Sequence, residues 1–329
     1  MKRREFLKQS AAGAAAFSML NGMSSAAETT PAETTAKVAL VKTDDRAKGI
    51  AAALKLVSFP SPKGKKVLIK PNFNTADPTP GSTHNDTLRQ LIVEMKARGA
   101  SQFRVGDSCG PGSTKSVIEQ KGIPALGKEL GFEVINFEEL PPEGFVHFNP
   151  PGCHWKDGFG VARPVVEAEY LLWTCCLKTH GFGGIHSMSI KLAVGTTNKS
   201  VRGEMHAAQN THMRRMIAEI HHAFTPQLIV MDGLEIFVDG GPMAGKRVNA
   251  GIIAAGTDRI AIDAVGLAVL KHHGSNDVIM SKKIFEQEQI ARAVEIGLGI
   301  KSPDQIEIVT ADADSRAYAA DLKKILAQG

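Results

Sequence analysis

Lys178 and His180 stand two positions apart at the end of the apolar segment 170–177, which has the composition of a buried strand. If the strand continues, their side chains lie on the same face of it. An imidazole titrates near neutral pH, so a histidine and a lysine at this place suit acid–base chemistry or ligand binding. We therefore predict Lys178 and His180 as the catalytic residues.

Polar residues also follow the other predicted strands. Lys70 comes after the strand 66–69, and a lysine beside a buried strand needs a carboxylate or an anionic ligand to balance its charge. Because open α/β sheets bind ligands beyond the carboxyl ends of their strands, these residues should converge. We predict one cleft lined by Lys70, Asp107, Lys178, His180 and Asp232. The predicted ligand-binding residues are Lys70, Asn72, Asp107, Ser108, Lys191 and Gly241, and the expected ligand is a small anion.

Two of these residues have a structural alternative. Asn72 could form a turn with the backbone that follows it, and Asp107 could cap the helix expected near Ser113. The sequence leaves both alternatives open.

Acidic and histidine residues near the same edge also suit a divalent cation, and Asp232, Asp263 and His206 are the candidate metal ligands. Asp263 lies in the nearly all-apolar helix 258–270, where a carboxylate must meet a cation or several N–H donors. No histidine pair has the spacing typical of zinc sites, and no CxxC motif occurs, which disfavours an iron–sulfur cluster. The cofactor stays unknown, and a divalent metal is one open alternative.

The elements that must position these residues alternate between strand and helix patterns from residue 37 onward. Such alternation predicts an α/β fold with a mainly parallel sheet and helices on both faces. The stretch 141–161 is rich in Gly and Pro and is expected to be an irregular insertion. We predict a single α/β domain over residues 37–329. The predicted strands are 37–41, 66–69, 103–105, 132–137, 170–177, 228–231, 251–255 and 306–309, and the main predicted helices are 45–57, 85–98, 258–270 and one beginning near 317.

The first residues resemble a twin-arginine export signal, with Arg3 and Arg4 followed by Glu-Phe-Leu-Lys and an Ala/Gly-rich apolar stretch. We predict a signal peptide over residues 1–27, cleaved near Ala26 or Ala27, and a linker over residues 28–36. An ordinary secretory signal or an amphipathic helix is the alternative. The twin-arginine interpretation predicts a periplasmic protein whose partner during export is the twin-arginine translocase.

Composition limits the other functions. The net charge of +5 includes +3 within the predicted leader, and two Trp and two Tyr offer little surface for base stacking, so we expect no nucleic-acid partner. No apolar run beyond the leader has the length of a membrane span, so we expect no membrane anchor in the mature protein. The four cysteines, at positions 109, 153, 175 and 176, are interpreted as buried free thiols, with a disulfide as the alternative.

Taken together, the motifs resemble the family called domain of unknown function 362, over essentially the whole mature chain. The matching segments are Lys70-Pro71-Asn72, Gly106-Asp107-Ser108, Lys178-Thr179-His180, Ile190-Lys191 with Gly195, His206, Asp232-Gly233 with Gly241-Pro242, and Asp258 to Ala264. Two positions depart from the family pattern, since Cys176 replaces a lysine and Leu192 replaces an asparagine.

The resemblance implies no particular reaction. The expected function is therefore that of an exported periplasmic protein with one polar site at the strand ends. Two classes stay open, a metal- or cofactor-dependent enzyme and a non-catalytic ligand-binding or redox-accessory protein.

Overall fold

The computed structural model describes residues 35–207 and 211–328. Its centre is a nine-stranded sheet, in which five neighbouring strands run parallel in the order β4-β3-β2-β7-β9. These strands are β2 (Lys66–Lys70), β3 (Gln102–Asp107), β4 (Glu133–Asn136), β7 (Tyr170–His180) and β9 (Leu228–Gly240). Their carboxyl ends share one edge, so the prediction of a mainly parallel α/β sheet is confirmed.

The sheet continues beyond β9 with mixed directions. The antiparallel hairpin of β9 and β10 (Gly245–Gly256) leads to β1 (Ala36–Lys42), which pairs with β11 (Ile306–Val309) in parallel. A short strand, β8 (Ile185–Ser187), folds back antiparallel on β7. The hairpin is much longer than the predicted strands 228–231 and 251–255. The prediction stopped short because charged residues interrupt the apolar pattern in the outer half of the hairpin.

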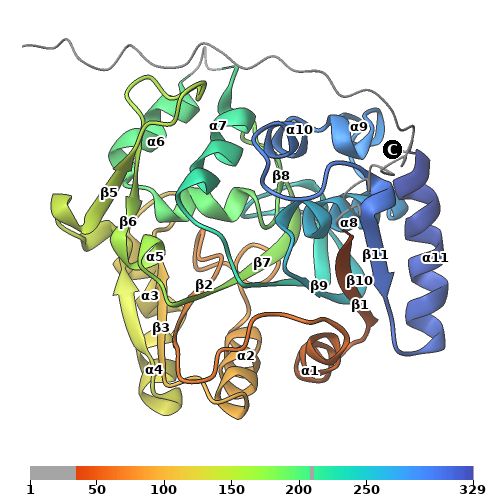
Figure 1. The fold of residues 1–329 in the computed structure, drawn as a ribbon, viewed down its shortest axis with the longest axis horizontal. Coiled ribbons are helices and arrows are strands. Elements are labelled where there is room, and N and C mark those ends of the chain that lie inside the picture. Colours follow the sequence, from red (N-terminus) through yellow and green to blue (C-terminus); the bar gives the residue numbers. More distant parts are fainter. Residues whose placement is uncertain (1–34, 208–210, 329) are drawn as a thin grey trace, which may run out of the picture. The chain divides into compact units, whose positions relative to one another are not determined.

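Helices cover both faces of the sheet, as predicted, and each face has its own apolar core. Figure 1 shows α1 and α2 on one side of the sheet and α7 and α10 on the other. The first face carries α1 (Arg46–Leu56), α2 (Asn85–Ala97), α3 (Thr114–Gln120) and α4 (Ile123–Leu130). The second carries α7 (Met213–Glu219), α8 (Arg259–His272), α10 (Glu288–Glu295) and α11 (Ala313–Gln328). Every residue of β7 is buried, which explains its continuous apolar run.

Local sequence signals set the helix boundaries. The Asp45 carboxylate caps α1 by accepting from the Lys48 amide at 3.0 Å, and Asp258 caps α8 through the Ala261 amide at 2.8 Å. The chain leaves α2 through Gly99, whose φ of +82° is unfavourable for residues with a side chain. These caps place the predicted helix starts within one residue of the observed ones.

The predicted insertion contains a separate two-stranded sheet of β5 (Phe145–Phe148) and β6 (Phe159–Ala162). The remaining helical elements are short. They are η1 (Phe137–Glu139), η2 (Pro142–Gly144), α5 (Arg163–Val166), η3 (Lys191–Thr196), α6 (Lys199–His206), η4 (Ile220–Ala223), α9 (Asp277–Met280), η5 (Ile284–Glu286) and η6 (Pro303–Gln305).

The predicted signal peptide, its cleavage position and most of the linker lie outside the described residues. Within residues 35–207 and 211–328, no helix combines the length and apolar character needed to cross a membrane. All four cysteines are free thiols; Cys153 is partly buried and the other three are buried.

Candidate functional site

A small polar pocket lies where β2, β3 and β7 end, closed by η3 and α6. Its volume is about 50 Å³. Six of the residues predicted for catalysis or ligand binding line it, namely Lys70, Asn72, Asp107, Ser108, His180 and Lys191. The structure therefore brings these six residues together, and their roles stay predictions.

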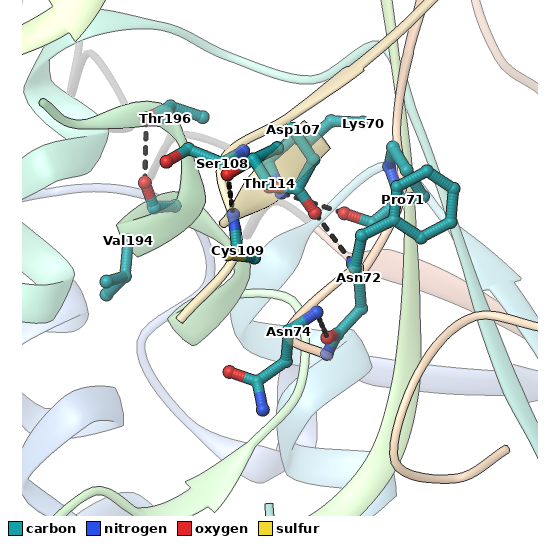
Figure 2. A network of polar contacts seen from close by, with 12 residues as sticks. Lys70, Pro71, Asn72, Asn74, Asp107, Ser108, Cys109, Thr114, Val194 and Thr196 are labelled. Carbon is teal, nitrogen blue, oxygen red and sulfur yellow. Dashed lines mark hydrogen bonds and ion pairs between the residues drawn. The ribbon is translucent and has the colours of Figure 1, made fainter. Parts of the chain in front are cut away.

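A buried ion pair forms one wall of the pocket. The Lys70 amine lies 2.7 Å from Asp107 Oδ1 and donates to the Pro71 carbonyl at 2.8 Å. The Asp107 carboxylate also accepts from the backbone amides of Phe73 and Ser108, each at 2.7 Å. Figure 2 shows Lys70 and Asp107 at the ends of neighbouring strands. Burial lowers the pKa of Lys70 and raises that of Asp107, while the charge of each partner opposes both shifts. The helix-cap alternative for Asp107 is wrong, because Ser113 caps α3.

Gly195 makes this arrangement sterically feasible. A Cβ atom at this position would stand 2.3 Å from Asp107 Oδ1 and 2.7 Å from Lys70 Nζ. The η3 backbone therefore approaches the ion pair as closely as only a glycine permits.

Asn72 has two roles. It lines the pocket, and its Oδ1 accepts from the Asn74 amide at 3.2 Å, a turn that is visible in Figure 2. The turn interpretation and the pocket interpretation are thus compatible.

Lys191 and Arg202 add two buried cations. Burial and the nearby charges of Lys178 and Arg202 lower the pKa of Lys191 to about 7. Arg202 of α6 donates to the carbonyl oxygens of Cys109 and Thr197, each at 2.7 Å, and burial lowers its pKa to about 10. Arg202 thus holds α6 against the loop after β3 and brings a guanidinium to the pocket wall.

His180 presents a neutral imidazole. Burial and the charges of Lys191 and Lys178 lower its pKa far below its ordinary value. Its Nδ1 has no hydrogen-bond partner among the described residues, and the same holds for Ser108 Oγ and Asn74 Nδ2. Three polar side chains that line one pocket therefore have unused hydrogen-bonding capacity.

Lys178 does not line the pocket, contrary to the predicted cleft. Its buried amine donates to the carbonyl oxygens of Gly81 and Pro242, at 2.5 and 2.9 Å. Burial lowers its pKa to about 8. The amine joins the loop after β2 to the β9–β10 turn, and Pro242 of that turn reaches the pocket. The catalytic role of Lys178 stays a prediction.

Asp232 also lies away from the pocket. It accepts from Arg46 Nε at 2.9 Å and from Thr87 Oγ1 at 2.7 Å, on the face that α1 and α2 cover. The prediction that it lines the cleft is wrong because β9 continues to Gly240, so Asp232 is not at a strand end.

Asp263 meets hydrogen-bond donors. Its carboxylate accepts from the Ser189 amide at 2.8 Å, the Ser189 hydroxyl at 2.5 Å and the Ile190 amide at 3.0 Å. Burial raises its pKa to about 7, although these donors favour the charged form. Asp263 therefore fixes the segment directly before Lys191.

The predicted metal ligands are not assembled. His206 lies at the end of α6 and is exposed on one side. The partial burial of its ring and the charges of Lys191 and Arg202 lower its pKa. In the part of the chain that the structure describes, no three His, Cys, Asp or Glu residues form a group that could hold a metal ion. Asp232 pairs with Arg46 instead, and Asp263 accepts hydrogen bonds from N–H and O–H donors.

Gly241 acts through its backbone. It has a φ of +71°, and a Cβ atom there would stand 2.2 Å from the Thr179 carbonyl oxygen. Its own carbonyl accepts from the Gly181 amide at 3.0 Å. Gly241 therefore places Pro242 at the pocket and itself stands outside the lining.

The sequence argument missed Arg202, Asn74, Ser187 and Gly195 as pocket residues. Gly195 was visible only as part of the family resemblance. Arg202 carried no signal, because its helix is polar and short and follows no predicted strand.

The fold and the site define an α/β protein with a small cationic pocket at the carboxyl edge of a mostly parallel sheet. The chain belongs to the family described as Domain of unknown function (DUF362), which matches residues 67–268 and so includes every residue of the pocket.

Two further similarities were found. A protein named Thylakoid-associated protein sll1697, from Synechocystis sp., is 24% identical over 218 residues. The matched region covers 63% of this chain and 64% of that protein, so the chain spans just under two thirds of this relative. The solved structure of the lactate racemase apoprotein from Thermoanaerobacterium thermosaccharolyticum is similar with a TM-score of 0.45 and 13% identity, over 88% of this chain and 85% of that chain.

Proposed function

We propose that this protein binds a small oxyanion, a carboxylate or a phosphate, in the pocket at the carboxyl ends of β2, β3 and β7. One observation carries the proposal. Lys70, Lys191 and Arg202 are buried in the pocket wall, and Asp107 is the single carboxylate in that lining. Uncompensated buried cations are costly, so an anion in the pocket would stabilise the folded chain.

The unpartnered groups fit the same ligand. The Ser108 hydroxyl and the Asn74 amide are donors without a partner among the described residues, and both line the pocket. An oxyanion accepts several hydrogen bonds at once and would satisfy them together with the cations.

The pocket also suits proton transfer, which supports an enzyme as the second candidate. Lys191 has a pKa of about 7, so its amine can exchange a proton near neutral pH, and the neutral His180 stands in the same wall. The reaction we propose in that case is acid–base chemistry at a group next to the bound anion.

The binding test is titration calorimetry with inorganic phosphate and with acetate. We expect both anions to bind, and Lys191→Met to weaken binding at least tenfold, about the loss of one charge-assisted hydrogen bond. Lys128→Met is the matched control, since Lys128 is an exposed lysine on α4. Binding that is absent, or equal in all three proteins, would contradict the proposal.

Periplasmic export through the twin-arginine pathway remains part of the proposal, supported by Arg3 and Arg4. Replacing both by lysine should leave folded precursor in the cytoplasm, because the translocase recognises the arginine pair and charge alone does not suffice. Cell fractionation followed by immunoblotting measures this. Normal export of the double variant would refute the twin-arginine route.

A further inference from the structure

We propose that the oxyanion carries an apolar, preferably aromatic, group, and that Phe182 binds this group at the pocket entrance. The inference rests on the proposed function and deepens it, since it names the class of ligand.

The size of the pocket gives the first argument. Its volume is about 50 Å³. For comparison, an apolar protein cavity that binds benzene has a volume of about 150 Å³. The pocket therefore admits a carboxylate or phosphate group, and the rest of any larger ligand must lie outside, over its entrance.

Phe182 is an exposed apolar side chain that contacts a pocket residue. It lies in the loop between β7 and β8, and 61% of it is exposed. Its ring meets the His180 ring edge-on, with 6.2 Å between the centroids, and His180 lines the pocket. Within the described ranges, it is the only strongly exposed aromatic residue. Covering this ring with an apolar group removes hydrocarbon from water, and aromatic groups gain further from ring contact.

The loop holds Phe182 in place. The Gly181 amide donates to the Gly241 carbonyl at 3.0 Å, Arg214 Nη1 donates to the Gly183 carbonyl at 3.0 Å, and Gln289 Nε2 donates to the Gly184 carbonyl at 2.7 Å. Because the backbone that carries Phe182 is already fixed, binding costs little backbone freedom, which favours affinity.

The loop backbone is also fitted to the pocket. A Cβ atom at Gly184 would stand 2.8 Å from Lys191 Cε and 2.9 Å from His180 Nδ1. Ile185, the next residue, has a φ of +68°, a strained conformation for a β-branched residue that persists only where the surroundings enforce it. The position of Phe182 is therefore coupled to the two pocket residues behind it.

The test compares plain anions with their phenyl derivatives by calorimetry. The probes are inorganic phosphate against phenyl phosphate, and acetate against phenylacetate, so that the two arms also identify the preferred anionic group. For the unmodified protein we expect the phenyl form to bind about three- to tenfold more tightly than the plain anion.

Phe182→Ala should abolish this preference, so that the plain anion and its phenyl derivative bind this variant with equal affinity. Phe182→Leu should retain part of it, because leucine is apolar but has no ring. Val93→Ala is the matched control, since Val93 is an exposed apolar residue on α2, and it should behave like the unmodified protein. Thermal melting verifies that each variant is folded.

Two outcomes overturn the inference alone. They are plain and phenyl anions of equal affinity in the unmodified protein, and a phenyl preference that survives in Phe182→Ala. If neither plain anion binds, the proposed function itself fails, and the inference fails with it.

Discussion

Two of the buried ion pairs in this protein, Arg46–Asp232 and Lys70–Asp107, differ in the charge that surrounds them. Asp232 is neutralised by Arg46 at 2.9 Å, receives a further hydrogen bond from Thr87, and lies under α1 and α2. Asp107 is neutralised by Lys70 at 2.7 Å, but two further cations, Lys191 and Arg202, line the same pocket. Both aspartates follow apolar strand sequence. The presence of a buried acid therefore does not indicate a binding site by itself. The balance of charges around the acid distinguishes a structural ion pair from a candidate binding site.

The largest expected effect comes from removing the aspartate of each pair. Asp107→Asn leaves the Lys70 amine buried without a counterion and should cost about 3–5 kcal/mol in the free energy of unfolding. Asp232→Asn should cost less, about 1–3 kcal/mol, because the Arg46 side chain is 17% exposed and can turn toward water. Urea unfolding measures both values.

Phosphate sharpens this test. If the pocket binds anions, adding phosphate should recover part of the stability of Asp107→Asn and none of that of Asp232→Asn. Equal losses in the two variants, with no recovery by phosphate, would remove the distinction between the two ion pairs.

Asp263 is a third buried acid, satisfied by donors without a cation. Asp263→Asn places an amide NH₂ group against the donors of Ser189 and Ile190 and should cost about 1–3 kcal/mol. Because the role we assign is structural, anion stoichiometry should stay unchanged. Unfolding and calorimetry on one preparation measure both, and lost anion binding at full stability would contradict this role.

The smallest effect concerns pH. Anion binding requires protonated Lys191, whose pKa is about 7, so acetate affinity should fall about tenfold for each pH unit above 7. Acetate itself stays fully charged over this range. Lys191→Met should bind weakly at every pH, and an affinity independent of pH would exclude Lys191 from the site.

The same group affects stability with the opposite sign. The pKa of Lys191 is about 7 in the folded chain and near the ordinary 10.5 when unfolded. Between these values the unfolded chain binds more protons, so the ligand-free protein should become more stable as pH rises from about 7 to about 10.5. The difference between the unmodified protein and Lys191→Met in urea unfolding isolates this contribution.

The sequence predicted the fold because strand and helix periods alternate clearly, and it predicted Lys70, Asp107, His180 and Lys191 because each stands near a strand end or in a recognised motif. It placed Asp232 wrongly because Asp232 and Gly233 interrupt the apolar pattern in the middle of β9, which was mistaken for the strand end. Arg202 was not predictable, since its place in the pocket depends on where η3 and α6 pack, and both elements are too short to show a clear sequence period. The local sequence pattern was thus enough to predict the strands, whereas the full set of pocket residues depends on tertiary packing.

Gly195 marks a position that can be compared between this protein and its relatives. A methyl group at this position would collide with both members of the Lys70–Asp107 pair, so a relative with another residue here must hold the pair or the turn differently. The residue at this position is therefore the first one to compare when asking whether a relative shares this site or only the fold.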